Sequence, residues 1–194
     1  LDIKGAEPVG DPEKVVATDG GQHQMWVAQA YAFERPRKFI SSCGLGTMGY
    51  GMGAAIGACM GSGKQTVLFT GDGSFHMNFN ELVTASKLGL DITVFVMDNH
   101  TLGMVRQWQT LFYHKHYSST DINYPTDFVK LAEALGATGF RLERNEDIDD
   151  VINKAFATKG VKVIDCMIDK DAFVLPMIPP GRNFVAILTH NPGL

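Results

Sequence analysis

The chain has 194 residues, 45% of them hydrophobic, and a formal net charge of -4 at pH 7, which suits one α/β domain with a sizeable core. The lysines and arginines are scattered and form no concentrated basic patch, so we expect no nucleic-acid partner. No apolar run approaches the roughly 20 residues that span a bilayer, and the first 15 residues do not resemble a signal peptide, so we expect no membrane partner either.

Short apolar runs alternate with longer segments of helical period along the whole chain. The runs predicted as strands are 14–19, 38–42, 66–70, 92–98, 139–143 and 161–168. The segments predicted as helices are 22–33, 48–60, 78–88, 102–114, 125–135 and 147–159. This alternation is typical of an open parallel sheet in three layers, with helices on both faces. We therefore predict a single α/β domain over residues 1–194, ending in an irregular proline-containing segment at 174–184.

The three cysteines, Cys43, Cys59 and Cys166, lie far apart among apolar or small residues. Their number and spacing indicate neither a disulfide framework nor a CxxC metal site. We expect all three to be buried free thiols.

Four glycine-rich or polar segments directly follow predicted strands. In an open parallel sheet, ligands collect at the carboxyl ends of the strands, so these segments are candidate binding positions. They are GGQH at 20–23, GLGTMG at 44–49, GDGS at 71–74 and DNHTLG at 98–103.

Two oxygen-bearing side chains, Asp72 and Asn99, end neighbouring predicted strands. They are 27 positions apart, which leaves room for one helix and one returning strand. A carboxylate, an amide oxygen, a backbone carbonyl and phosphate oxygens form an oxygen-only shell. Such a shell suits octahedral Mg²⁺ that carries a diphosphate.

A GDG motif followed at this interval by an Asn-containing strand end resembles the signature of thiamine-diphosphate enzymes, although Asp98 stands where a second Asn is usual. The resemblance narrows to the C-terminal domain of the acetohydroxyacid synthase (acetolactate synthase) catalytic large subunit. It is carried by TDGGQHQMW (18–26), CGLGTMGYGMGAAIGA (43–58), GDGSFHMNFNEL (71–82), LGMVRQWQTLFY (102–113) and VLPMIPPG (174–181). These motifs span nearly the whole chain, which the resemblance implies is part of a longer three-domain polypeptide.

The resemblance also implies a set of site residues. Mg²⁺ would be bound by the side chains of Asp72 and Asn99 and by the backbone carbonyl of Thr101. The residues implied to hold the diphosphate are Gln22, His23, Gly73, Ser74, Leu102 and Gly103. The residues implied on the pyrimidine side of the cofactor are Gly46, Met48 and Met104. Trp108, Met104 and Met25 would line the pocket of the second substrate, and no side chain of this chain is assigned as a catalytic acid or base.

The function implied by the resemblance is the condensation of pyruvate with a second 2-oxo acid, either pyruvate or 2-oxobutyrate. The products would be acetolactate or acetohydroxybutyrate and carbon dioxide, in branched-chain amino-acid biosynthesis. The cofactors would be thiamine diphosphate and Mg²⁺, with FAD only in the full-length parent. We expect a homodimer or larger assembly, a regulatory small subunit as a further partner, and a location in the cytoplasm, or in a plastid or mitochondrion of a eukaryote.

Three alternatives remain open from the sequence. The chain could belong to another thiamine-dependent 2-oxo acid decarboxylase or oxidase, or it could be one subunit of a naturally split enzyme. It could instead be an NAD-binding oxidoreductase domain, because Gly44-x-Gly46-x-x-Gly49 follows a predicted strand and satisfies the dinucleotide pattern. An activating Glu from a neighbouring domain, which the thiamine reaction would require, is not found here, so we expect the isolated chain to be inactive.

Overall fold

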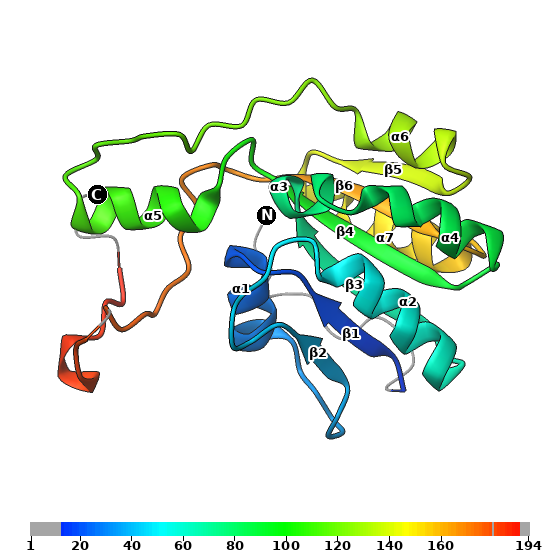
Figure 1. Ribbon diagram of the computed structural model, residues 1–194, viewed down its shortest axis with the longest axis horizontal. Coiled ribbons are helices and arrows are strands. Elements are labelled where there is room, and N and C mark those ends of the chain that lie inside the picture. Colours follow the sequence, from blue (N-terminus) through cyan, green and yellow to red (C-terminus); the bar gives the residue numbers. More distant parts are fainter. Residues whose placement is uncertain (1–12, 180, 191–194) are drawn as a thin grey trace.

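The computed structural model describes residues 13–179 and 181–190, and their centre is one all-parallel, six-stranded sheet of order β2-β1-β3-β4-β6-β5 (Figure 1). Its strands are β1 Val15–Thr18, β2 Phe39–Ser41, β3 Thr66–Gly71, β4 Ile92–Asp98, β5 Thr138–Leu142 and β6 Lys162–Met167. All six predicted strands are confirmed. The first 12 residues of the predicted domain and Pro180 in its tail lie outside the described residues.

Seven α-helices connect or flank these strands in the described ranges. They are α1 Gln22–Ala30, α2 Gly51–Ser62, α3 Asp72–His76, α4 Leu82–Lys87, α5 Gly103–Phe112, α6 Phe128–Ala134 and α7 Ile148–Ala157. Short 3-10 turns are η2 Phe79–Glu81, η3 Asn145–Asp147 and η4 Phe184–Ala186. None of the helices in this part of the chain is long and apolar enough to cross a membrane.

Two of the predicted helix boundaries that bear on the site were wrong. The sequence predicted a candidate binding segment at 71–74 and a helix only from residue 78, whereas helix α3 already begins at Asp72, directly after the extended Gly71. Asp72 suits this position because a carboxylate stabilises the positive end of a helix. The second helix starts at Gly51 and not at Met48, because Gly49 has a left-handed φ of 82° that a helix cannot contain.

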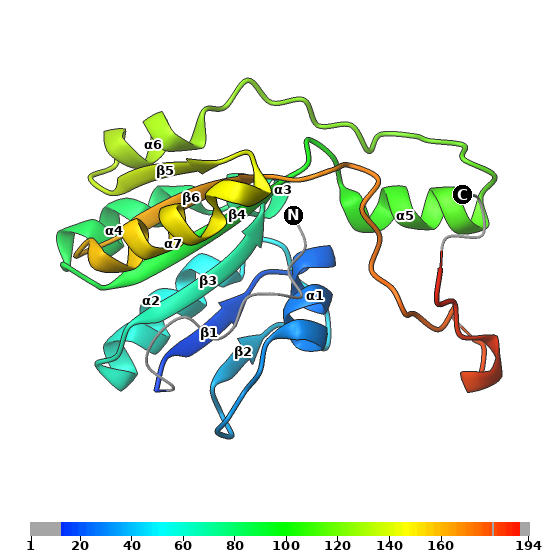
Figure 2. The same ribbon diagram turned by 180° about the vertical axis from the view of Figure 1, so that it is seen from behind.

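The predicted three-layer arrangement is confirmed. Helices α2, α4 and α6 cover one face of the sheet, and α7 covers the other (Figures 1 and 2). Strand β4 shows why both faces need cover: Val94 and Val96 belong to the core under the first group, and Phe95 and Met97 to the core under α7. Neighbouring side chains of a strand point to opposite faces, so this continuous apolar run requires helices on both sides.

Helix α5 and the segment after β6 extend away from the carboxyl ends of the strands (Figure 1). The described part of the predicted irregular tail is irregular, with an isolated bridge between Met177 and Leu188 and the short turn η4. Helix α5 holds this segment through buried polar side chains, of which Arg106 donates from Nε to Asp171 at 2.8 Å.

The expectation for the cysteines was right at two positions and wrong at one. Cys59 and Cys166 are buried free thiols, whereas Cys43 is exposed. Cys43 lies in the loop between β2 and α2, where its small neighbours mark a turn and not the core.

Candidate active site at the carboxyl ends of the strands

A pocket lies where β1, β3 and β4 end, and it gathers residues from all four segments singled out in the sequence. The implied cofactor residues that line it are Gln22, His23, Met48, Asp72, Gly73, Ser74, Asn99, Thr101, Leu102, Gly103 and Met104. Gly46 does not line this pocket. It lies on the exposed loop before α2 with a φ of 61°, and its carbonyl approaches Gly20 so closely that a Cβ on Gly20 would clash with it.

Three helices begin at this pocket. The first residues of α1, α3 and α5 follow Gly21, Gly71 and Leu102, and none of these three preceding residues makes a capping hydrogen bond through a side chain. The first N–H groups of a helix have no partner within it, and they carry the positive end of the helix dipole. Three such ends around one pocket make it a cradle for an anion such as a diphosphate.

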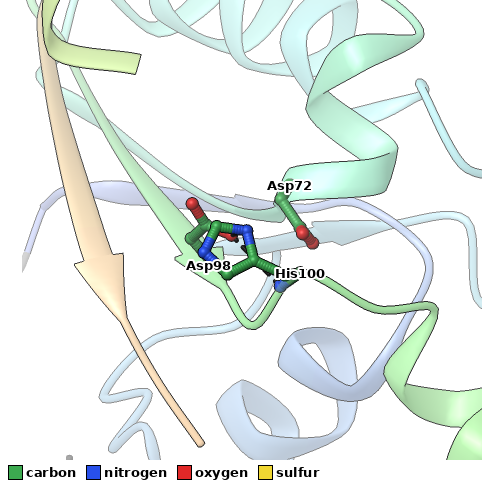
Figure 3. Close-up of side chains that lie close together, drawn as sticks. All are labelled: Asp72, Asp98 and His100. Atoms are coloured by element: carbon green, nitrogen blue, oxygen red, sulfur yellow. Dashed lines mark hydrogen bonds and ion pairs between the residues drawn. The ribbon is translucent and has the colours of Figure 1, made fainter. Parts of the chain in front are cut away.

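Two carboxylates lie beside this cradle. Asp72 begins α3 and Asp98 ends β4, and both are almost completely buried, at 5% and 2% exposure. Figure 3 shows them with His100, whose Nδ1 lies 3.2 Å from Oδ1 of Asp98. Burial and the nearby Asp98 carboxylate raise the pKa of Asp72 to about 8. A divalent cation here would favour the ionised carboxylates and would join them to an anion in the cradle.

Three hydrogen bonds shape the turn after β4. The backbone N–H of Thr101 donates to Oδ1 of Asn99 at 3.1 Å, and that of His100 donates to Oδ1 of Asp98 at 3.2 Å. The Thr101 hydroxyl donates to the carbonyl of Thr120 at 2.8 Å. The Thr101 side chain is thus engaged with the protein, and the resemblance implies that Thr101 would serve a metal through its backbone carbonyl.

The buried His23 offers an unused polar atom to the pocket. Its Nε2 has no hydrogen-bond partner among the described residues, although the ring is only 5% exposed. Burial lowers the pKa of His23 to about 4, although a hydrogen bond with the Asp19 backbone opposes this shift. A buried polar nitrogen without a partner is costly, and a phosphate oxygen would satisfy it if the ring donates from Nε2. The donor set therefore fits a diphosphate.

The structure gives the Gln22 side chain a further role within the protein. Its Nε2 donates to Oε1 of Gln107 at 2.9 Å and to the carbonyl of Ala172 at 2.8 Å. Gln107 is itself buried, accepts from the Val174 N–H at 2.9 Å and donates to the Val174 carbonyl at 3.1 Å. The sequence reasoning missed Gln107. Nothing in the sequence of the QWQ stretch distinguishes a buried, hydrogen-bonded glutamine from one on the surface.

Asp19 is a second residue that the sequence reasoning missed. It is 1% exposed, and its carboxylate accepts from the Gly51 N–H at 2.9 Å and from the Thr70 hydroxyl at 2.8 Å. Burial raises the pKa of this carboxyl, while the backbone donors of the loop before α2 lower it. A dinucleotide would place its diphosphate at the start of α2, where this carboxylate already lies, so the geometry disfavours the NAD alternative.

A second, mainly apolar pocket adjoins the first. It is lined by Met25, Met104, Gln107, Trp108, Pro176, Met177, Ile178 and Ile187. It contains all three implied substrate residues, and Met104 lines both pockets. The sequence did not indicate the contribution of Pro176, Met177, Ile178 and Ile187, which come from a segment about 70 positions after α5.

Comparisons with known proteins agree with this site. Residues 19–166 match the family described as "Thiamine pyrophosphate enzyme, C-terminal TPP binding domain". The acetolactate synthase of Mycobacterium bovis is 46% identical over 181 residues, which are 90% of this chain and 29% of that protein. The acetolactate synthase isozyme 2 large subunit of Escherichia coli is 44% identical over 170 residues, 87% of this chain and 31% of that protein.

A yeast relative extends the comparison beyond bacteria. The mitochondrial acetolactate synthase catalytic subunit of Saccharomyces cerevisiae is 41% identical over 179 residues, 92% of this chain and 26% of that protein. The chain thus spans less than a third of the length of these relatives. The family match covers the strand ends, the anion cradle and the carboxylates, and the chain belongs to the thiamine pyrophosphate enzymes, as their C-terminal cofactor-binding domain.

Proposed function

We propose that the chain is the diphosphate-binding part of an acetolactate synthase, which joins pyruvate to a second 2-oxo acid with loss of carbon dioxide. The observation that carries the proposal is the convergence of three uncapped helix ends and the buried Asp72 carboxylate on one pocket. The names of the relatives support this reaction over that of other thiamine-dependent decarboxylases and oxidases.

One set of residues in this chain would bind the diphosphate of the cofactor, and another set would bind Mg²⁺. The uncapped N–H groups and His23 would take the diphosphate, and Asp72, Asn99 and the Thr101 carbonyl would take Mg²⁺. The carboxylate of Asp72 would repel the diphosphate without the cation. Binding of thiamine diphosphate should therefore depend on a divalent ion.

The apolar pocket would receive the second 2-oxo acid. Bound thiamine diphosphate supplies the carbanion chemistry through which a 2-oxo acid loses carbon dioxide and passes on its two-carbon remainder. Trp108 and Met25 would contact the alkyl group of the acceptor and exclude water from it. The chain itself would bind and orient the cofactor and the acceptor. The proton transfers would need residues from outside the chain.

The proposal extends to the longer protein only by similarity to its relatives. We propose that the full-length polypeptide binds FAD, assembles as a homodimer or larger oligomer, and pairs with a regulatory small subunit. One relative is named a large subunit and another a catalytic subunit, which supports the last point.

Calorimetry with thiamine diphosphate tests the proposed site. The folded chain should bind the cofactor saturably only in the presence of Mg²⁺, and Asp72→Ala should weaken binding at least about 100-fold, since a direct metal ligand is lost. Asp150→Ala is the matched control, because Asp150 is an exposed carboxylate that pairs with Lys154. Metal-independent binding, or full binding by Asp72→Ala, would refute the proposed site.

A product assay tests the reaction on the full-length polypeptide. With pyruvate as the only substrate, the proposal requires acetolactate. Acetaldehyde without acetolactate would identify a decarboxylase, and peroxide formation an oxidase.

A further inference from the structure

We propose that residues 120–126 form a brace between the turn after β4 and the start of α3, and that His76 anchors this brace to α3. These two elements carry the groups assigned above to Mg²⁺. The inference therefore rests on the proposed function, and it adds the part of the chain that sets the spacing of those groups. His76 does not line the cofactor pocket, so it is a positioning residue that acts through Asp72.

The brace lies in a long connection between two helices. Residues 113–127, all of them described, join α5 to α6 without a regular helix or strand, and they run past α3 on the way (Figures 1 and 2). Loops longer than about 12–15 residues with no secondary structure are uncommon in compact domains, and many of those that occur are functional. Within this connection, residues 120–126 contact both elements that carry the proposed metal ligands.

Backbone hydrogen bonds attach the brace to the turn after β4. The Leu102 N–H and the Thr101 hydroxyl both donate to the Thr120 carbonyl at 2.8 Å. The Ile122 N–H donates to the His100 carbonyl at 3.1 Å, and Thr101 forms an isolated antiparallel bridge with the brace. This pairing fixes the register of the brace against the turn, because each bond joins one particular donor to one acceptor.

The ring of His76 attaches the other end of the brace to α3. Its Nδ1 lies 2.8 Å from the Asp72 carbonyl oxygen, and its Nε2 lies 2.7 Å from Oγ1 of Thr126. A carbonyl can only accept, so Nδ1 donates to Asp72, and Nε2 of the neutral ring accepts from the Thr126 hydroxyl. The half-buried ring also packs on Tyr124, with centroids 4.4 Å apart. Both ring nitrogens are thus engaged, one with the start of α3 and one with the brace.

The side chain of Ile122 fills the space between the two elements. A Cβ added to Gly73 would lie 3.3 Å from Cδ1 of Ile122 and 3.1 Å from Cδ2 of Leu102. Ile122 therefore packs against the first turn of α3, while its backbone is bonded to the turn after β4. A close-packed interior leaves little room for α3 to move without the brace.

The short length of α3 makes this support necessary. The helix has five residues, too few to be stable without tertiary contacts. Mg²⁺ demands near-ideal octahedral geometry with oxygens at about 2.0–2.1 Å, so Asp72 and Asn99 must be held at one separation. The brace joins the elements that carry these two residues, and a loosened brace should weaken the binding of Mg²⁺.

Amide hydrogen exchange on the purified chain without cofactor tests the coupling through the brace. Thr126→Val removes the hydroxyl and leaves a side chain of similar size. It should speed exchange of the Leu102 and Ile122 N–H groups at least about 5-fold, because these bonds lie at the other end of the brace. Thr158→Val is the matched control, since its hydroxyl donates to the Lys154 carbonyl on the surface of α7.

Calorimetric titrations with thiamine diphosphate test the positioning role of His76. In both His76→Asn and Thr126→Val, the Mg²⁺ concentration needed for half-saturation should rise about 10-fold. His76→Asn keeps a donor at the place of Nδ1 and loses the bond to Thr126, so the double variant should be no worse than either single variant. Ala155→Gly in the core under α7 is the control for lost stability. It should lower the urea midpoint and leave the Mg²⁺ requirement unchanged.

Three results would overturn the inference. They are unchanged exchange at Leu102 and Ile122 in Thr126→Val, additive losses in the double variant, and an equal rise in the Mg²⁺ requirement in Ala155→Gly. Circular dichroism checks that each variant is folded, and either His76→Asn or Thr126→Val alone suffices for the Mg²⁺ comparison. A wild-type chain that binds no thiamine diphosphate would refute the proposed function and, with it, the role of the brace in cofactor binding. The exchange result, obtained without cofactor, would still decide whether the brace couples the two elements.

Discussion

His23 is a residue whose titration should contribute to the pH dependence of the stability of the chain. Its folded pKa of about 4 lies below the ordinary value of 6.5, so the unfolded state takes up a proton between these values and the folded state does not. The contribution of His23 to stability should therefore be complete above pH 6.5 and fall as the pH drops towards 4, by up to about 3 kcal/mol. Urea denaturation at a series of pH values measures this loss.

The His23 prediction has a direct control. His23→Gln removes the titrating ring, so the variant should lose less stability than the wild type between pH 6.5 and 4. Equal losses in the two proteins would show that other groups cause the acid sensitivity.

Gly103 lies at a position where the site has no room for a side chain. A Cβ at this position would clash with Oε1 of Gln22 and lie 2.7 Å from Nδ2 of Asn99. We expect Gly103→Ala to destabilise the fold by about 1–3 kcal/mol and to weaken cofactor binding, since it displaces Asn99.

The matched control is Gly57→Ala in the middle of α2, where a Cβ meets nothing within 4 Å. Alanine is a better helix former than glycine, so this change should stabilise the chain by about 0.5–1 kcal/mol. Thermal melts of both variants, together with cofactor titrations, give the comparison. Equal effects of the two substitutions would contradict the close approach at Gly103.

At the scale of elements, the buried amide of Gln107 is one of the side chains that attach α5 to the segment after β6. Gln107→Leu would leave the Val174 N–H and Nε2 of Gln22 without this acceptor, at about 1–3 kcal/mol for each unpaired group. The variant should be less stable and should be cleaved faster by a protease after β6. Gln109→Leu is the control. Gln109 is on the same helix, but its side chain forms hydrogen bonds with Ser118 on the surface. Equal protease sensitivity of the two variants would contradict the role given to Gln107.

At the scale of the whole molecule, we propose that the chain binds the cofactor and that residues outside it supply the catalytic acid and base. We expect the 194-residue chain to bind thiamine diphosphate and Mg²⁺ but to form no acetolactate from pyruvate. The physical reason is that the apolar pocket beside α5 is open, so the chain alone cannot exclude water from the reacting groups. A colorimetric acetolactate assay on the chain, with a full-length relative as positive control, measures this. Acetolactate formation by the isolated chain would show that it contains every residue required.

The sequence by itself determined the strands and most of the cofactor pocket. Continuous apolar runs such as 92–98 can be buried only in a sheet covered on both faces, so period and composition were sufficient to locate them. Asp72 and Asn99 could be paired because their interval fits one helix and one strand. The resemblance to acetohydroxyacid synthase supplied the roles of Met104 and Trp108, which period and spacing leave open.

Only the tertiary structure decided which polar groups are buried together. The amide of Gln22 meets Ala172 across 150 positions, and Gln107 meets Val174 across 67, distances at which the chain carries no local signal. Helix α3 has five residues, too few for a helical period to be recognised. Asp98 and His100 approach Asp72 only because parallel strands end at the same edge of the sheet and the turn after β4 folds back. Spacing predicted which strands carry these residues, and the packing of the strand ends decided which atoms meet.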